Sequence, residues 1–592
     1  MVFQPSFRRP DAGGLRRLPL VLFVALLGWT AACSRVSQES DGRAPEGAPP
    51  PAAEESAALP AADGPELARF VVQARDAEQA ARLGEELVAR YGGEASARPL
   101  FEAVDPADDP DGMARMFRVA IPASGLGSAN PWENAYALEA ELALAQAEPD
   151  LEATHDPALE TAQICLSDDA PPEDPRWSLE SIRAVEAWQL EPPPGGKRFG
   201  EGVVVCHPDT GWSEHVDLDA ARLDLAHARN LLGNGTPDGR DPLDYEGVLL
   251  HPGHGTGTGS VIVSGHEAGR VFGVAPGARL VPIRTAMSVV QVFDSDLARA
   301  IDHAAAAGCD VVSMSLGGRA FFGLEAAIRR AVRRGTIVAA AAGNCVRFVV
   351  APAAYRDTLA IGGSNVHDGT WRGSSRGPAV DVSAPAEHVW VASRHKASDP
   401  TDAARPGEGT SYAVANVAGA AALWLAFHGP DALAARYGDV PLQEVFRALA
   451  QRTARVPAGW DAGRYGAGIL DVEALLRAPL PSPAAILPLV PERGEGELEI
   501  LAAITGRTPG ELAPLLAELF GVATLDVEDR LRVVGPELEQ LALTDPVGFE
   551  RLLGRLAGEE GTGGANALAG ASATLRDALD PALAPASGGG AP

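Results

Sequence analysis

Short apolar runs alternate with Ala-rich helical segments between about residues 175 and 478. The runs are GVVVC, RLVPIR, VVSMSLGG, TIVAAAAGN and TLAIGGSN, and segments such as DLARAIDHAAAAG and GLEAAIRRAVRRG lie between them. Strands that are apolar throughout are buried on both faces, which is typical of a parallel sheet. We therefore predict an α/β fold, a three-layer parallel sheet with helices on both faces. Ligands of such sheets bind beyond the C-terminal ends of the strands.

The remaining sequence predicts further domains around this one. With 592 residues the chain is too long for a single core, and two to four domains are expected. Residues 65–155 alternate strand-like and helix-like segments, which predicts a small α+β domain. Residues 156–478 form the parallel-sheet domain, and the amphipathic residues 479–560 predict a small helical region. The Gly- and Ala-rich residues 561–592 predict a largely disordered tail, with a short helix near ATLRDAL as an alternative.

The first 64 residues predict export. Four arginines precede an apolar stretch over residues 18–32 that is too short for a comfortable membrane span. Residues 1–33 resemble a bacterial lipoprotein signal, in which Cys33 is lipidated and attaches the protein to a membrane; plain secretion with cleavage near Cys33 is the alternative. Residues 34–64, rich in Ala, Pro and Glu, predict a disordered linker. We expect the mature protein in the cell envelope, lipid-anchored, or outside the cell.

Charge and cysteine content exclude some classes of protein. A net charge of −30 argues against nucleic acid as a partner, because phosphate binding needs clustered Lys and Arg. The five cysteines match no zinc site, and we predict no metal site and no required cofactor. The acidic residues 238–244 fit no defined calcium loop, so a solvated turn is expected there and structural calcium is the alternative. Cys206 and Cys309 are predicted as small core residues, with a disulfide among Cys165, Cys206, Cys309 and Cys345 as the alternative.

Four polar residues stand where predicted strands end or helices begin. Asp209 follows GVVVCHP, His254 opens a Gly-rich helix start, Asn344 follows TIVAAAAG, and Ser411 precedes a long apolar helix. These are the groups that acyl transfer requires. A serine hydroxyl needs a His to take its proton, the His needs a buried carboxylate to orient it, and an amide can bind the developing oxyanion.

The residues of these four motifs and their order along the chain resemble those of the subtilisin-like serine proteases, the subtilases. The shared motifs are DTG, HGT, AAGN and GTSxA, and the resemblance extends over about residues 177–476 through VFGVAPGARLVPIR, SSRGPAVDVSAPA and RYGAGILDVEALL. It implies a triad of Asp209, His254 and Ser411 with Asn344 in the oxyanion hole. His254 is preferred to His207 and His251 because only His254 has the HGT context.

The resemblance has further implications for substrate and maturation. Ser315, Leu316 and Gly317, in VVSMSLGG, are expected to pair with the backbone of a protein or peptide substrate. Residues 65–155 resemble the family's inhibitory and folding-assisting propeptide. The expected protein is therefore a serine endopeptidase made as a self-processing zymogen that is cleaved between about residues 155 and 175.

The sequence departs from the family pattern around these motifs. Pro208 lacks an N–H group and is expected to end its strand just before Asp209. Gly257-Thr258-Gly259 removes side-chain bulk behind His254, which predicts a looser helix. Three residues at or just after the serine motif also differ from those usual in the family: Tyr412, Ala415 and Asn416.

These departures leave two alternatives open. One is a catalytically degenerate subtilase fold that serves as a surface binding or scaffold protein. The other is a non-peptidase serine hydrolase. The absence of the Gly-x-Ser-x-Gly nucleophile elbow around Ser411 argues against this second alternative. A dinucleotide-binding loop at GHGTGTGS is not favoured, because Arg284 rather than an acidic residue follows the next strand.

Overall fold

The computed structural model describes eleven stretches of the chain. They are residues 66–102, 104–150, 167, 169–218, 221–233, 235–247, 250–265, 270–289, 295–490, 496–554 and 570–579. The predicted signal, the linker, Cys33 and Cys165 lie outside the described residues. So do most of the predicted processing region and most of the predicted tail.

The N-terminal part is a small α+β domain. Its antiparallel sheet has the order β2-β3-β1-β4, with two helices packed on it. Asp76 and Asn130 accept hydrogen bonds from the first turns of these helices. Strand β2 was not predicted, because it is only four residues long and none of these residues is buried. The bounds are β1 (Leu67–Gln73), α1 (Ala77–Tyr91), β2 (Ser96–Pro99), η2 (Pro106–Asp108), η3 (Met113–Arg115), β3 (Met116–Pro122), η4 (Ala123–Gly125), α2 (Pro131–Leu142) and β4 (Gln146–Pro149).

The central domain contains the predicted parallel sheet. Seven strands lie in the order β11-β10-β9-β8-β5-β7-β6, and the paired strands are parallel throughout. The strands are β5 (Val204–Asp209), β6 (Arg229–Asn230), β7 (Arg279–Arg284), β8 (Val311–Met314), β9 (Ile337–Ala341), β10 (Leu359–Ser364) and β11 (Val382–Pro385). An antiparallel pair, β12 (Val389–Ala392) and β13 (Ala404–Gly407), leads into the serine motif.

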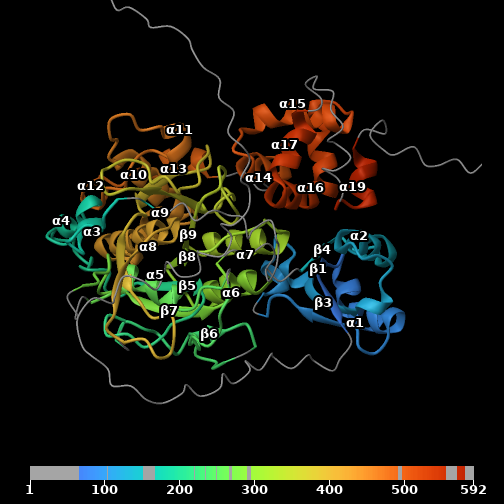
Figure 1. The fold of residues 1–592 in the computed structure, drawn as a ribbon, viewed down its shortest axis with the longest axis horizontal. Coiled ribbons are helices and arrows are strands. Elements are labelled where there is room, and N and C mark those ends of the chain that lie inside the picture. Colours follow the sequence, from blue (N-terminus) through green and yellow to red (C-terminus); the bar gives the residue numbers. More distant parts are fainter. Residues whose placement is uncertain are drawn as a thin grey trace, which may run out of the picture. The chain divides into compact units, whose positions relative to one another are not determined.

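Helices cover both faces of this sheet, as the sequence predicted (Figure 1). Val205 and Val311 face α5 (His254–Val263) and α8 (Thr410–His428) in one hydrophobic cluster. The next residues along the same strands, Cys206 and Val312, face α6 (Ser295–Ala306) and α7 (Phe322–Arg333) in another. Neighbouring strand residues thus enter opposite cores. The remaining helices of this domain are α3 (Trp177–Ser181), α4 (Ala184–Ala187), α9 (Pro430–Tyr437), α10 (Leu442–Thr453), α11 (Ala462–Tyr465), α12 (Val472–Arg477), α13 (Pro483–Ile486) and η5 (Leu487–Leu489).

Helix α8 is the most apolar long helix in the described part of the chain. Its 19 residues would be long enough and apolar enough to cross a membrane, but the whole apolar window is buried inside the protein. It is therefore the central core helix, and its first turn carries Ser411.

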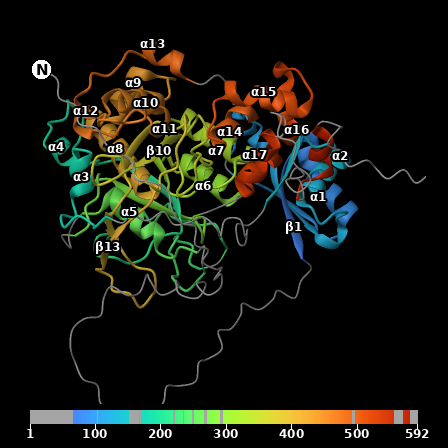
Figure 2. The ribbon, with the colours of Figure 1, turned by 45° about the horizontal axis from the view of Figure 1, so that its top comes forward.

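The C-terminal region is helical and packs onto the central domain. Leu501, Leu516 and Leu538 belong to the same hydrophobic cluster as Phe321 and Val349 of the central domain. Figure 2 shows these helices grouped beside the N-terminal domain. The predicted tail includes the short helix α19, which Ser572 caps through the N–H of Leu575. The bounds are α14 (Glu497–Ile504), α15 (Pro509–Phe520), η6 (Thr524–Asp526), α16 (Val527–Thr544), α17 (Pro546–Gly554) and α19 (Ala573–Ala578).

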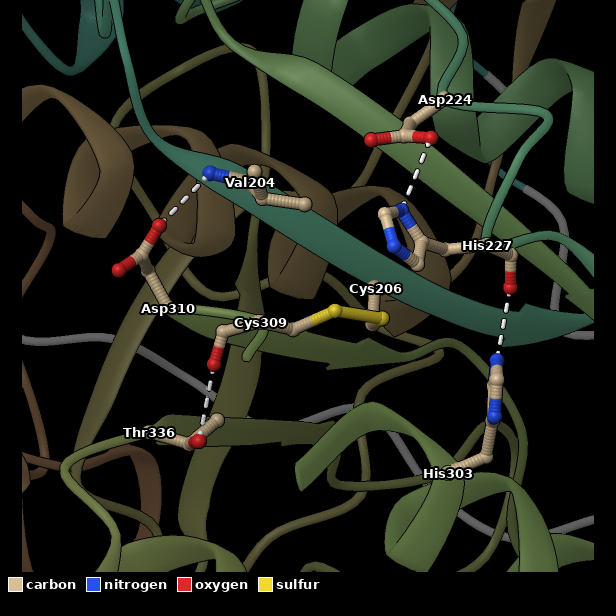
Figure 3. The surroundings of a disulfide bond; sticks show 8 residues. All are labelled: Val204, Cys206, Asp224, His227, His303, Cys309, Asp310 and Thr336. Carbon is tan, nitrogen blue, oxygen red and sulfur yellow. Dashed lines mark hydrogen bonds and ion pairs between the residues drawn. A yellow bond between two sulfur atoms is a disulfide. The ribbon is translucent and has the colours of Figure 1, made fainter. Parts of the chain in front are cut away.

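A disulfide joins Cys206 of β5 to Cys309, just before β8 (Figure 3). Both residues are buried as predicted, and of the two readings it is the alternative, a disulfide, that the structure shows, because the two strands lie side by side and the Cα atoms are 5.8 Å apart. The carboxylate of Asp310 next to the bond accepts the N–H of Val204 at 2.8 Å, and the Thr336 hydroxyl donates to the Cys309 carbonyl at 2.9 Å. Both strands are thus held by side-chain hydrogen bonds next to the disulfide.

Candidate active site

Asp209 and His254 form a buried acid–imidazole pair. Asp209 is the last residue of β5 and is fully buried, and His254 is the first residue of α5. Nδ1 of His254 lies 2.8 Å from Oδ1 and 3.1 Å from Oδ2 of Asp209. Burial alone would raise the pKa of Asp209, but the charge and the hydrogen bond of His254 outweigh burial and hold this pKa below its usual value. The carboxylate is therefore ionised and can only accept, so Nδ1 is the donor in this hydrogen bond and Nε2 is the ring nitrogen that the bond does not use.

The start of α5 is fixed by close backbone packing. Gly253 has a positive φ of 76°, and a Cβ there would lie 1.7 Å from the Arg394 carbonyl oxygen. Its N–H donates to Asp241 at 2.7 Å. Asp241 also accepts from the N–H of Leu243 and from the hydroxyl of Tyr245 and is 2% exposed, so the expectation of a solvated turn is wrong at this residue. No group of three or more His, Cys, Asp or Glu side chains is arranged to hold a metal within the described ranges.

The small residues behind His254 are closely packed. A Cβ on Gly259 would lie 2.8 Å from Leu280 Cδ2, and one on Gly257 would lie 3.4 Å from the Ala392 carbonyl oxygen. Thr258, between them, donates its hydroxyl to the His254 carbonyl at 3.0 Å, and the same oxygen lies 3.4 Å from Asp209. Neighbouring strands thus approach the helix closely where side-chain bulk is missing behind His254, which does not favour the predicted loosening of the helix.

The end of strand β5, next to Asp209, differs from the prediction. Strand β5 continues through Pro208 to Asp209, so the prediction that proline ends the strand is wrong. Pairing with β8 extends only to Cys206. His207 is buried beside the pair, with Nε2 3.1 Å from the Thr258 hydroxyl, and burial lowers its pKa and keeps it neutral.

Ser411 is the second residue of α8 and is 5% exposed. Its hydroxyl donates to the Ser315 carbonyl at 3.2 Å, and the Ser315 hydroxyl donates to the Ser411 carbonyl at 3.0 Å. Tyr412 stands next to it, with its ring centroid 6.5 Å from that of His254. In the described structure the Ser411 hydroxyl is thus hydrogen-bonded to Ser315 and not to His254. The hydrogen bond between carboxylate and imidazole is formed, but the one between hydroxyl and imidazole is not.

The amide of Asn344 is oriented by Thr410. Oδ1 of Asn344 accepts both the N–H of Thr410, at 2.8 Å, and its hydroxyl, at 2.9 Å. With Oδ1 used in this way, Nδ2 is the group left to donate. A Cβ on Gly409 would lie 3.4 Å from Nδ2, so this donor lies beside the turn that leads into Ser411.

An apolar pocket opens beside Ser411 and Asn344. Ser315, Leu316 and Gly317, which were predicted to pair with the substrate backbone, line this pocket. The N–H of Gly317 already donates to the Val289 carbonyl at 3.1 Å. The other lining residues are Val289, Gly318, Arg319, Ala341, Gly343, Val346, Phe348, Val350, Thr410, Leu543 and Thr544.

Sequence reasoning missed several residues of this site. Thr258 lies one helical turn after His254 and Thr410 directly precedes Ser411, so both could have been found from spacing. Asp241 could not, because its partner Gly253 is reached only through the fold. Leu543 and Thr544 carry no local signal, since they are more than 100 residues beyond Ser411.

A parallel α/β domain with a carboxylate, an imidazole and a serine at one edge defines a hydrolase-type site. The sequence matches the Subtilase family over residues 200–468. It is 31% identical to Thermitase of Thermoactinomyces vulgaris over 44% of this chain and 87% of that protein. It is 30% identical to Subtilisin BL of Lederbergia lenta over 38% of this chain and 76% of that protein. Among solved structures, MycP1 from the ESX-1 type VII secretion system matches 56% of this chain and 93% of its own, with 23% identity and a TM-score of 0.41.

The chain therefore belongs to the subtilase family of serine peptidases. Peptides are accordingly its substrate class, and the fold predicted from the strand pattern is confirmed.

Proposed function

We propose that the protein is a serine endopeptidase in which Ser411 attacks the scissile carbonyl. His254 takes the hydroxyl proton on Nε2 and passes it to the leaving amine, while Asp209 holds the ring and stabilises the imidazolium. Nδ2 of Asn344 and the N–H of Ser411 bind the oxyanion. The observation that carries this proposal is the buried, ionised Asp209 at 2.8 Å from Nδ1 of His254, which orients the ring and leaves Nε2 outside this bond.

The proposal requires a rotation of Ser411. Its hydroxyl donates to Ser315 in the structure, so χ1 has to change before the oxygen reaches His254. Catalytic hydrogen bonds are often loose without substrate and tighten when it binds. A degenerate, non-catalytic protein is the second candidate, favoured by this same Ser411–Ser315 bond.

A fluorophosphonate probe separates the two candidates. The probe reacts only with an activated serine, so we expect labelling of the wild-type protein and none of Ser411→Ala. Asp209→Asn serves as a matched control, because it keeps the shape of the side chain but loses the charge that orients His254. Equal labelling of wild type and Ser411→Ala contradicts the nucleophile assignment, and no labelling of wild type supports the degenerate protein.

Asn344→Ala tests the oxyanion donor. We expect kcat to fall by about two to three orders of magnitude with little change in KM, because the amide donates to a charge that exists only in the transition state. Steady-state kinetics on a chromogenic peptide measure both constants. An unchanged kcat contradicts this role of Asn344.

We further propose that the N-terminal α+β domain is a propeptide that the enzyme removes. The domain docks on the helices that cover the sheet, where Asp150 accepts the N–H and the hydroxyl of Ser295 at 3.1 and 2.7 Å. Arg118 forms an ion pair with Asp296 at 3.1 Å, so the N-terminal domain is held by both hydrogen bonds and an ion pair. Ser167, inside the predicted processing range, donates its N–H to Glu408 at 2.8 Å, three residues before Ser411.

Mass spectrometry of purified protein tests this maturation. The wild type should lose residues up to a site between about 155 and 175, whereas Ser411→Ala should keep them. If both proteins are cut at one site, another protease performs the cleavage. The same spectra test the anchor that we propose at Cys33, since a diacylglyceryl mass should be present in Ser411→Ala, which keeps its N-terminal residues, and absent when Cys33→Ala is added. The Cys206–Cys309 bond agrees with export, because disulfides persist mainly outside the cytoplasm.

A further inference from the structure

One wall of the pocket beside Ser411 comes from the C-terminal helical region. Leu543 and Thr544, the last two residues of α16, line the same pocket as Ser411 and Asn344. The rest of the lining near them is apolar, with Leu316 and Phe348 among its side chains. A segment remote in sequence thus shapes the space beside the candidate nucleophile.

This wall is built into the catalytic domain. Leu531, Val534 and Leu538 of α16 are fully buried in the hydrophobic cluster that also contains Leu316 and Val349. The Pro536 carbonyl of α16 accepts a hydrogen bond from the guanidinium of Arg319. In the neighbouring helix α14, the carbonyl of Ala503 accepts the N–H of Val349 at 3.4 Å. The same cluster also includes apolar residues of the N-terminal domain, such as Leu100 and Met116.

The polar groups near the wall already have partners. The Thr544 hydroxyl donates to the Gln540 carbonyl in its own helix at 2.7 Å. The fully buried guanidinium of Arg319 pairs with Glu148 of β4. Glu539 of α16 also lies near Arg319. The pocket therefore suits an uncharged, apolar side chain.

We propose that α16 completes the primary specificity pocket, and that Leu543 and Thr544 restrict it to small and medium-sized apolar side chains of the substrate. The proposal rests on the proposed peptidase function and adds its specificity. The side chain that precedes the cleaved bond packs against Leu316 and Phe348 on the catalytic side and against Leu543 on the side of α16. The C-terminal region is thus a part of the substrate site.

Substitutions at Leu543 that change its size in opposite directions test this role. The full-length protein is assayed with three peptides that differ only in Ala, Leu or Phe before the cleaved bond. Leu543→Ala should raise the ratio of kcat/KM for Phe over Ala by about tenfold, because the added space accepts the ring. Leu543→Trp should lower the values for Leu and Phe at least about tenfold and spare Ala. Leu541→Ala is the matched control, since Leu541 is partly buried on the same helix but does not line the pocket.

Labelling of Ser411 by a fluorophosphonate accompanies each assay and separates two kinds of failure. Wild-type protein that does not label removes the peptidase function and this inference together. Variants that label normally but keep the wild-type ratio of Phe to Ala overturn the role of α16 alone. An equal shift in Leu541→Ala also overturns it, because the effect is then a general loosening of the helix. Leu543→Val keeps an apolar side chain in the wall, and it should shift the ratio in the same direction as Leu543→Ala even where alanine destabilises the helix end.

Discussion

Threonine hydroxyls hold the candidate catalytic groups in place. Thr258 donates to the backbone of His254 and lies beside Asp209, and Thr410 fixes the amide of Asn344 through its N–H and its hydroxyl. Thr258 is 4 residues from His254, whereas Thr410 is 66 residues from Asn344, so only the first of these contacts is local in sequence. Orientation of this kind decides whether a donor points at the place where charge develops in the reaction.

Replacing Thr410 by Val tests this positioning. The variant keeps the backbone N–H bond to Asn344 but loses the hydroxyl, so the amide is held by one bond instead of two. We expect kcat to fall about fivefold with KM nearly unchanged, in line with the loss of one hydrogen bond worth about 1 kcal/mol. Thr410→Ser restores the hydroxyl and should recover most of the rate. If Thr410→Ser is as slow as Thr410→Val, packing of the methyl group and not the hydrogen bond is responsible.

At the level of elements, α14 and α16 bring acidic side chains into a shared interior. Glu497 of α14 faces Glu539 of α16, and the charges of Glu148, Glu325 and Arg319 also act on it. Burial raises the pKa of Glu497 to about 7, and it raises the pKa of Glu539 well above its usual value. A single arginine cannot balance this many carboxylates, so some of them are protonated where the helices are docked.

The packing of these helices should therefore depend on pH. Between about pH 4.5 and 7 the folded protein binds a proton on Glu497 that the unfolded chain does not bind. The stabilisation is complete below pH 4.5 and is lost as the pH rises through 7. Thermal unfolding of Ser411→Ala protein, in which the N-terminal domain should remain, measures this. Adding Glu497→Gln should flatten the decline of Tm across this window, whereas Glu518→Gln, at an exposed position of α15, should not. Parallel Tm profiles with and without Glu497→Gln would contradict the assignment.

Across the whole molecule, one covalent bond ties distant parts of the chain. Cys206 and Cys309 are separated by 103 residues, and the loop between them contains His254 with all of α5, β7 and α6. Closing a loop of this length restricts the unfolded chain far more than the folded one.

Removing the bond should lower stability without changing the site. For Cys206→Ala/Cys309→Ala we expect a loss of about 2–5 kcal/mol in the free energy of unfolding, measured by denaturant titration. Fluorophosphonate labelling of Ser411 under native conditions should be unchanged. A loss below about 1 kcal/mol would mean that the unfolded chain gains little freedom when the bond is absent.

Much of the fold was predictable, because local pattern determines it. The apolar runs marked the central strands, and the ends of β5 and β9 and the starts of α5 and α8 indicated where Asp209, Asn344, His254 and Ser411 stand. What was missed depends on contacts between remote segments. The Cys206–Cys309 pairing follows from the neighbouring positions of β5 and β8, which periodicity does not reveal. Leu543 lies in the pocket only because a helix of the C-terminal region docks there.

The shared core between α6, α7 and the C-terminal helices also affects how the protein can be dissected. The stretch after residue 478 supplies leucines such as Leu501, Leu516 and Leu538 to a cluster that the catalytic half cannot close alone. A recombinant fragment that ends where the family match ends, at residue 468, would expose an apolar surface to water and would tend to precipitate. Gene-fusion or domain-transplant experiments should therefore keep the C-terminal helices attached to the fold that they cover.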